Sequence, residues 1–438
     1  MSTPRKQAPP AATTDSTKAH PVPGQVPKRA APTKRTVPAK KAAARKKTPK
    51  KSAPRQGAAA PQAAKLGPAG AHPNIHHVVV LVQENHTTDN YLSGLAPYGV
   101  NVATGWPVTP NPPAHDQPHD RHAYYRWLQS GHATHSQVDT VAVLTFYAHL
   151  ALTGALLENH CSGFGTNSTP NHLLLVGGQS PTMRNPPRTA PPVWDMPSVP
   201  GLAQDHGVSW RCYTAYGGYP VSFYTQLNAS PNVVRTGQFL SDAAAGTLPA
   251  LSYVWHASPA DEHPPADVTI GQHAVWAAVD AVVRGGLWDQ TVFLLTWDDW
   301  GGWDDHVATP NVEHTSDQVQ CAYGPRVPLL MFGGAVPATI DSRWCSHVSV
   351  PKTVIQLLGL PPLGVPRVDD DPGLADLVRP TASVPPPPSL GTQVTLPPAP
   401  SPSKAPHALP TPLGPSIPTP DVILRNGKTL PPPNDVLV

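Results

Sequence analysis

The stretch VVVLVQENHTTD, residues 78–89, decides the fold that this sequence can adopt. It begins with five consecutive apolar residues, four of them β-branched, which is typical of a strand buried on both faces. The strand ends abruptly at Glu84 and Asn85, and ligands bind at the carboxyl ends of strands in open α/β sheets. A carboxylate beside an amide oxygen can bind a hard divalent cation. The alternative interpretation is a plain polar turn in which Thr87 or Thr88 caps the next helix.

A second stretch of the same kind, TWDDWGGWDDHV, spans residues 296–307. It also leaves a buried strand and breaks into acids, so we expect Asp298 and Asp299 at the same sheet edge as Glu84 and Asn85. Carboxylates that converge there repel one another unless a cation neutralises them, which predicts one divalent metal ion, its identity open. The glycine pair in this stretch allows close approach of the backbone after the ligands. Two aspartates that merely cap a turn are the alternative.

Strands and helices are predicted to alternate through the middle of the chain. The helix expected at 270–283 has its apolar residues on one face at the 3.6-residue period, and the last helix is stopped by a glycine and a proline. Strands separated by helices indicate an α/β fold with a mainly parallel sheet sandwiched between helices. The expected strands are 78–83, 208–213, 251–255, 291–297 and 328–332, and the expected helices are 138–157, 270–283 and 350–358.

Charge is distributed unevenly along the chain. Residues 1–65 contain sixteen Lys and Arg against the single acid Asp15, a net charge of about +15. Subtracting these from the 31 basic and 28 acidic residues of the chain leaves 15 basic and 27 acidic residues in the remainder. Because the arm has almost no large apolar residue, its composition predicts disorder. Such an arm either tethers the protein to nucleic acid or another polyanion, or acts as a solubilising tail.

Composition therefore predicts three regions: a disordered basic arm at 1–70, one large α/β domain at 73–378, and a Pro-rich disordered tail at 379–438. Neither a signal-peptide core nor a transmembrane segment is visible, so a cytoplasmic location is the default expectation, with export by another route left open. The cysteines have no metal-type spacing. We expect buried thiols, with disulfides as the alternative on export, for Cys161, Cys212, Cys321 and Cys345.

The loop at residues 166–171, TNSTPN, supplies candidate nucleophiles. A Ser or Thr hydroxyl is a weak nucleophile at neutral pH, but a divalent cation beside it lowers its pKa. Hydroxyl-rich loops are common, so this loop alone does not identify an enzyme.

Taken together, the motifs resemble a bacterial phosphoesterase family that contains phosphatidylcholine-preferring phospholipases C and a related acid phosphatase. That family belongs to the alkaline phosphatase superfamily, so the resemblance implies an alkaline-phosphatase-like fold and makes 73–378 the catalytic domain. The motifs that carry it, in chain order, are VVVLVQENHTTDNYLSG, NSTPNH, ADEHPP, WDDWGGWDDHV, GPRVP and SHVSVPKTVIQLLGL.

The resemblance implies a nucleophile and a metal site. Ser168, two residues before the Pro-Asn pair of the family, would be both the nucleophile and a metal contact, with Thr169 as the fallback. The implied activity is hydrolysis of a phosphoric ester, of the phosphatase or phospholipase C type, through a phosphoseryl intermediate. The alternative is a non-catalytic domain in a protein that binds nucleic acid or another polyanion through its basic arm. The implied metal ligands are Glu84, Asn85, Asp298, Asp299 and Ser168.

Histidines complete the implied site. His263, within ADEHPP, would contact the phosphoryl group, and His122 or His119 would do the same. His306 would either bind substrate or support another side chain. The chain departs from the family after Glu-Asn, where His-Thr-Thr at 86–88 replaces the usual Arg-Ser-Phe and alters a cation and an aromatic ring near the site.

Overall fold

The computed structural model describes most of the expected α/β domain. The expected basic arm and the chain from residue 400 onward lie outside the described residues, as does the side chain of Cys321. Of the other cysteines, Cys161, Cys212 and Cys345 are free and buried, as expected. The described residues are 72–131, 133–187, 189–308 and 323–399, with the backbone of 313–314 and 320–321.

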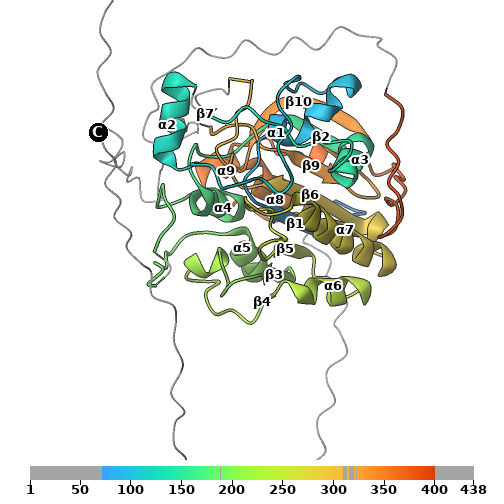
Figure 1. Ribbon diagram of the computed structural model, residues 1–438. Helices are drawn as coiled ribbons and strands as arrows, with labels where there is room; N and C mark the ends of the chain where they lie inside the picture. The colour runs from blue at the N-terminus through green and yellow to red at the C-terminus, as the bar shows by residue number, and fades with distance from the viewer. Residues whose placement is uncertain are drawn as a thin grey trace, which may run out of the picture. The chain divides into compact units, whose positions relative to one another are not determined.

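An eight-stranded sheet, in the order β10-β2-β9-β6-β1-β5-β3-β4, forms the centre of the domain (Figure 1). All neighbouring strands are parallel except β9, which runs antiparallel to both β2 and β6. The prediction of a mainly parallel sheet is therefore confirmed. The strands are β1 His77–Gln83, β2 Ala155–Cys161, β3 Trp210–Thr214, β4 Val233–Arg235, β5 Leu251–Trp255, β6 Thr291–Trp297, β9 Leu329–Phe332 and β10 Thr339–Ser346. A separate antiparallel pair consists of β7 Glu313–His314 and β8 Gln320–Cys321.

Helices cover both faces of the sheet, which confirms the predicted layers. Along β1, Val78, Val80 and Val82 join one hydrophobic cluster, together with residues of α4, α5 and α8. Val79 and Leu81 join a second cluster, with residues of α3, α6 and α7. The alternation of side chains along a strand thus places apolar residues in two cores, one on each face. The helices are α1 Thr88–Leu92, α2 Arg121–Ser130, α3 Thr145–Thr153, α4 Ser168–Gly177, α5 Val199–Asp205, α6 Gly237–Ala244, α7 Val268–Arg284, α8 Ser349–Leu358 and α9 Pro366–Asp369.

The structure differs from the expected elements at two places. The single helix predicted at 138–157 is wrong, because α3 ends at Thr153 and β2 begins at Ala155. Gly154 makes this junction possible, since a Cβ there would lie 2.6 Å from the carbonyl oxygen of Met331. An uninterrupted apolar run does not distinguish a buried helix from a buried strand. The sequence also gave no sign of β10, an edge strand with polar residues at its centre.

The first part of the expected Pro-rich tail is packed on the domain. The backbone N–H of Val384 donates to Gly334, and the indole of Trp288 donates to the carbonyl oxygen of Val384 at 2.8 Å. Val394 and Leu396 pack against the second hydrophobic cluster. Residues 379–399 are exposed or half-buried and form neither helix nor strand, as expected of an extended, solvated segment, but they contact the domain at these points. Within the described residues, no helix has the length and apolar character needed to cross a membrane.

Candidate active site

The two strand ends predicted to meet do meet. Strands β1 and β6 are parallel neighbours with Gln83 beside Trp297, so the residues that follow each strand emerge at the same sheet edge. The backbone N–H of Asn85 donates to Oδ1 of Asp298 at 3.1 Å, and the N–H of Asp298 donates to the carbonyl oxygen of Gln83 at 3.0 Å. Asp299 follows directly and is fully buried. The carboxylates and the amide expected from the sequence thus lie together.

Backbone conformation fixes the positions of these side chains. Asn85 has a φ of 66°, in the left-handed region that few residues other than glycine adopt. Gly301 has a φ of 61°, and a Cβ there would lie 2.3 Å from the carbonyl oxygen of Asn85. The chain after β6 can therefore return against Asn85 only because residue 301 is glycine. The helix-capping interpretation also holds, because Thr87 caps α1 and accepts from the N–H of Asn90 at 3.2 Å.

Ser168, the first residue of α4, lies at the same sheet edge. Its hydroxyl lies within hydrogen-bond distance of two carboxylate oxygens, Oε2 of Glu84 at 3.2 Å and Oδ2 of Asp299 at 3.4 Å, and the residue is 5% exposed. The amino end of a helix carries partial positive charge, which favours negative charge developing on this oxygen. Thr169 points elsewhere, with its hydroxyl 3.1 Å from the hydroxyl of Tyr219.

The charges of the acidic residues in this cluster favour a bound cation. Burial and the charge of Glu84 raise the pKa of both Asp298 and Asp299 well above the usual range. Burial also raises the pKa of Glu84, but the hydrogen bond and the charge of His172, together with the charge of His263 and a hydrogen bond from Ser168, outweigh it and the net shift is downward. Oδ2 of Asp298 is buried without a hydrogen-bond partner among the described residues. An orphaned buried oxygen within a set of hard oxygen donors fits a divalent metal ion.

His172 was not among the residues predicted from sequence. Its Nε2 lies 3.2 Å from Oε1 of Glu84 and 3.4 Å from Oδ2 of Asp298, and its side chain is fully buried. On the opposite edge of the ring, Nδ1 accepts from the indole N–H of Trp255 at 3.2 Å. The signal that could have found it is spacing, because His172 lies four residues after Ser168 and residues at that interval share one face of a helix.

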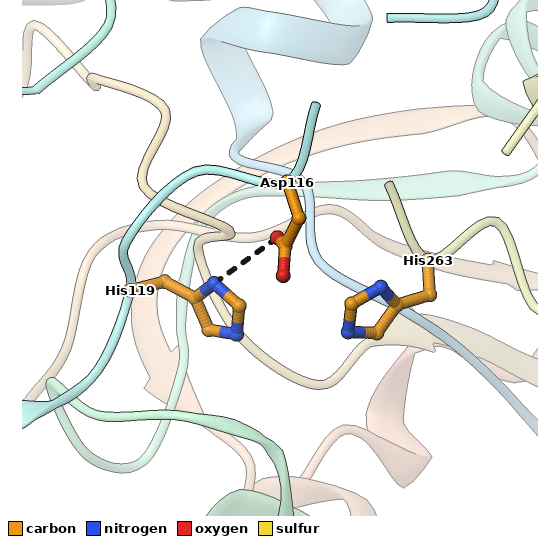
Figure 2. A group of neighbouring side chains, drawn as sticks. All are labelled: Asp116, His119 and His263. Atoms are coloured by element: carbon orange, nitrogen blue, oxygen red, sulfur yellow. Dashed lines mark ion pairs between the residues drawn. The ribbon is translucent and has the colours of Figure 1, made fainter. Parts of the chain in front are cut away.

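Two predicted histidines flank Asn85 (Figure 2). Nε2 of His119 and Nε2 of His263 lie 3.2 and 3.3 Å from its side-chain amide, and the ring centroids are 6.0 Å apart. Each ring directs Nδ1 at a backbone carbonyl oxygen, at 2.6 and 2.8 Å respectively. The carboxylate of Asp116, which lies between the two rings in Figure 2, approaches Nδ1 of His119 at 3.4 Å. These two histidines, which the resemblance places near the phosphoryl group, therefore lie next to the acid cluster.

The other two predicted histidines lie elsewhere. His122 is an exposed residue of α2, and no described contact joins it to the Glu84 cluster. His306 places Nδ1 2.6 Å from Oδ2 of Asp89, in a second cluster of charges. There the buried Arg326 binds Asp89 at 3.1 Å and Asp305 at 2.8 Å. This second cluster joins the segments after β1 and β6 and gives them a common support.

The chain is similar to several known proteins. The chain is 30% identical to non-specific phospholipase C6 of Arabidopsis thaliana over 32% of each chain. It is 23% identical to phospholipase C A of Mycobacterium tuberculosis over 58% of this chain and 64% of that protein. The matches thus span less than two thirds of either relative. Among solved structures, a protein of the alkaline phosphatase superfamily from Vibrio parahaemolyticus aligns with a TM-score of 0.42 and 13% identity, covering 71% of this chain and 73% of that one.

The family itself is shown by a family model. The Phosphoesterase family model matches residues 114–361, more than half of the chain. This match includes Ser168, His263 and the acids that follow β6. The chain therefore belongs to the Phosphoesterase family.

Proposed function

We propose that this protein is a metal-dependent hydrolase of phosphoric esters with Ser168 as its nucleophile. The observation that carries the proposal is the position of the Ser168 hydroxyl, which lies within hydrogen-bond distance of both Glu84 and Asp299 at the amino end of α4. Membership of the Phosphoesterase family and relatives that are named phospholipases C support it.

The oxygen donors at the sheet edge form the site for one divalent cation. When bound, such an ion supplies positive charge that lowers the pKa of a nearby hydroxyl and offsets charge on phosphoryl oxygens. The burial of Asp298 and Asp299 limits competition from water for these donors. The residues that would hold the ion are Glu84, Asn85, Asp298, Asp299 and Ser168.

The side chains of the site can carry out the phosphoryl and proton transfers of a two-step reaction. Oγ of Ser168 bonds to phosphorus, its proton passes to the carboxylate of Glu84 or Asp299, and the bond from phosphorus to the leaving oxygen breaks. The leaving oxygen takes its proton from His119 or His263, whose rings flank Asn85. Water then adds to phosphorus and gives a proton to the histidine that lost one, while the Oγ–P bond breaks and Oγ of Ser168 takes back its proton from the carboxylate. The product is phosphate from a monoester or a phosphorylated head group from a diester.

Hydrolysis of two chromogenic substrates tests this proposal. The full chain should hydrolyse p-nitrophenyl phosphate, p-nitrophenyl phosphorylcholine or both, and the activity should disappear with a chelator and return with a divalent cation. The preferred substrate separates a phosphatase from an enzyme of the phospholipase C type. Ser168→Ala should be inactive, with its fold checked by circular dichroism. Activity that survives complete chelation would overturn the metal requirement, and full activity of Ser168→Ala would overturn the assigned nucleophile.

A further inference from the structure

We propose that His172 is a positioning residue, locked in one orientation by Trp255, that holds the carboxylates of Glu84 and Asp298 through its Nε2–H and does not itself bind the metal. The inference rests on the proposed function, because it assigns a role beside the cation site. Ligand atoms of Glu84, His172 and Asp298 all lie within 4.8 Å of one another, a spacing that would also suit a three-residue metal site. The hydrogen bonds around the ring separate these two possibilities.

The indole of Trp255 determines which nitrogen of His172 carries hydrogen. An indole N–H can only donate, so Nδ1 of His172, 3.2 Å away, must present its lone pair. The single hydrogen of the neutral ring is then on Nε2. The atom that faces the carboxylates is therefore a donor with no lone pair for a metal ion.

The Nε2–H makes one hydrogen bond and one longer contact, and both involve predicted metal ligands. It donates to Oε1 of Glu84 at 3.2 Å and lies 3.4 Å from Oδ2 of Asp298. A hydrogen placed between the half-buried carboxylate of Glu84 and the buried carboxylate of Asp298 reduces their repulsion and fixes where their remaining lone pairs point. Outer partners of this kind orient the groups that bind a metal ion.

The position of the ring links three elements of the fold. His172 lies one turn after Ser168 on α4, so the helix that presents the nucleophile also carries the group that orients Glu84. Trp255 is the last residue of β5, the parallel neighbour of β1. Its ring is 4% exposed, and His172 is fully buried, so water does not compete for this hydrogen bond. A shift of α4 along the sheet would break both contacts of the ring.

Nitrogen NMR of the full chain, with ¹⁵N-labelled histidine, tests the assignment directly. His172→Gln identifies the resonance by its loss from the spectrum. We expect hydrogen on Nε2 and a lone pair on Nδ1 in the metal-free protein, with Nε2 still protonated after saturation with Zn²⁺ or Mg²⁺. Loss of the Nε2 hydrogen on metal binding would make His172 a ligand and overturn the proposal.

Calorimetric titration with the metal ion alone measures the consequence for binding. His172→Leu removes the donor and should weaken metal affinity by about 10–100-fold, the range for outer partners of metal ligands. In His172→Gln the side-chain amide N–H can replace Nε2–H, so this variant should recover most of the affinity. Equal affinity of wild type and His172→Leu would overturn the proposal. If His172→Leu does not fold, the glutamine variant and the NMR measurement still decide the question.

Trp255→Phe removes the indole donor and keeps an aromatic ring. It should allow hydrogen on Nδ1 and lower metal affinity about tenfold. Trp210→Phe is the matched control, because Trp210 lies on the adjacent strand β3, is also 4% exposed, and has an indole nitrogen without a hydrogen-bond partner among the described residues. Equal effects of the two substitutions would show that packing alone is responsible and would overturn the role of Trp255.

These results are separable from failure of the proposed function. If wild type neither binds a divalent cation nor hydrolyses a phosphoester, the proposed function fails, while the tautomer in the metal-free protein still tests the hydrogen-bond assignment. If wild type is active and metal-dependent but His172→Leu binds metal equally well, the proposed function stands and the role of His172 is overturned.

Discussion

The Ser168 hydroxyl lies 3.2 Å from Oε2 of Glu84, although 84 residues separate the two in the chain. Glu84 follows a strand at the centre of the sheet, and Ser168 begins the helix α4 that packs on one face of that sheet. The contact therefore depends on the register between the helix and the strand. Because the two residues are in contact, a substitution of Ser168 and a substitution of Glu84 both test the same candidate site.

Replacement of Ser168 by Ala should lower the rate of phosphoester hydrolysis by at least about 10³-fold, because the neighbouring hydroxyl cannot take its place. Thr169 directs its hydroxyl at Tyr219, so Thr169→Val should stay within about fivefold of wild type in the same assay. A large loss in Thr169→Val with activity retained in Ser168→Ala would exchange the two roles.

Removal of one carboxylate should weaken metal binding. Asp299→Asn keeps the shape of the side chain but removes a negative charge from the cation site, and calorimetry should show a loss of affinity of about 100-fold or more, above the range for outer partners. Asp304→Asn is a suitable control, since Asp304 is a buried acid of the same segment that accepts from the Trp127 indole at 2.6 Å. A comparable loss in the control would argue against a specific role for Asp299.

The same aspartate should make the stability of the cation-free protein depend on pH. Burial raises the pKa of Asp299 well above its usual 3.8, so the folded state binds this proton more tightly than the unfolded state. Stability relative to Asp299→Asn should therefore fall as pH rises from about 4 toward neutrality, by up to about 1.4 kcal/mol per pH unit. Urea unfolding at several pH values in the presence of a chelator measures this difference, and a difference that is constant with pH would contradict the assignment. Saturating divalent cation should abolish the effect.

The buried cluster around Arg326 should be a major source of stability. Arg326→Met leaves the carboxylates of Asp89 and Asp305 without their cation, and we expect a loss of about 3–5 kcal/mol in the free energy of unfolding. Arg343→Met removes an arginine that is 33% exposed and pairs with Asp341 and Asp376, so it should cost about 1 kcal/mol or less. Denaturant unfolding of the two variants gives the comparison. Equal losses in the free energy of unfolding would show that burial does not determine how much these ion pairs contribute to stability.

The sequence predicts the sheet edge better than it predicts the groups around it. A buried strand that ends in acids has a clear period and a clear end, so the meeting of Glu84 with Asp298 follows from topology alone. The apolar run at 138–157 has no comparable break, and its division into α3 and β2 depends on the close approach of Gly154 to Met331. Local pattern contains no information about such a tertiary contact.

For the same reason, the sequence alone does not show which histidines belong to the candidate site. The chain contains 21 of them, so residue type alone selects none. His119 and His263 contact the side chain of Asn85 from separate loops. His306, which directly follows Asp305 in the chain, instead contacts Asp89. His172 lies at helical spacing from Ser168, but only the position of Trp255 beside it reveals which of its nitrogens faces the acids. Side-chain direction of this kind is set by packing between elements.

Detection of phosphate on Ser168 tests the central claim most directly. The protein is mixed with p-nitrophenyl phosphate or p-nitrophenyl phosphorylcholine in the presence of divalent cation, quenched during turnover with denaturant at neutral pH, and digested for peptide mass spectrometry. We predict a phosphoryl or phosphorylcholine adduct on Ser168 that is absent from Ser168→Ala and from protein treated with a chelator. An adduct on Thr169 or on a histidine during turnover, with Ser168 unmodified, would contradict the account.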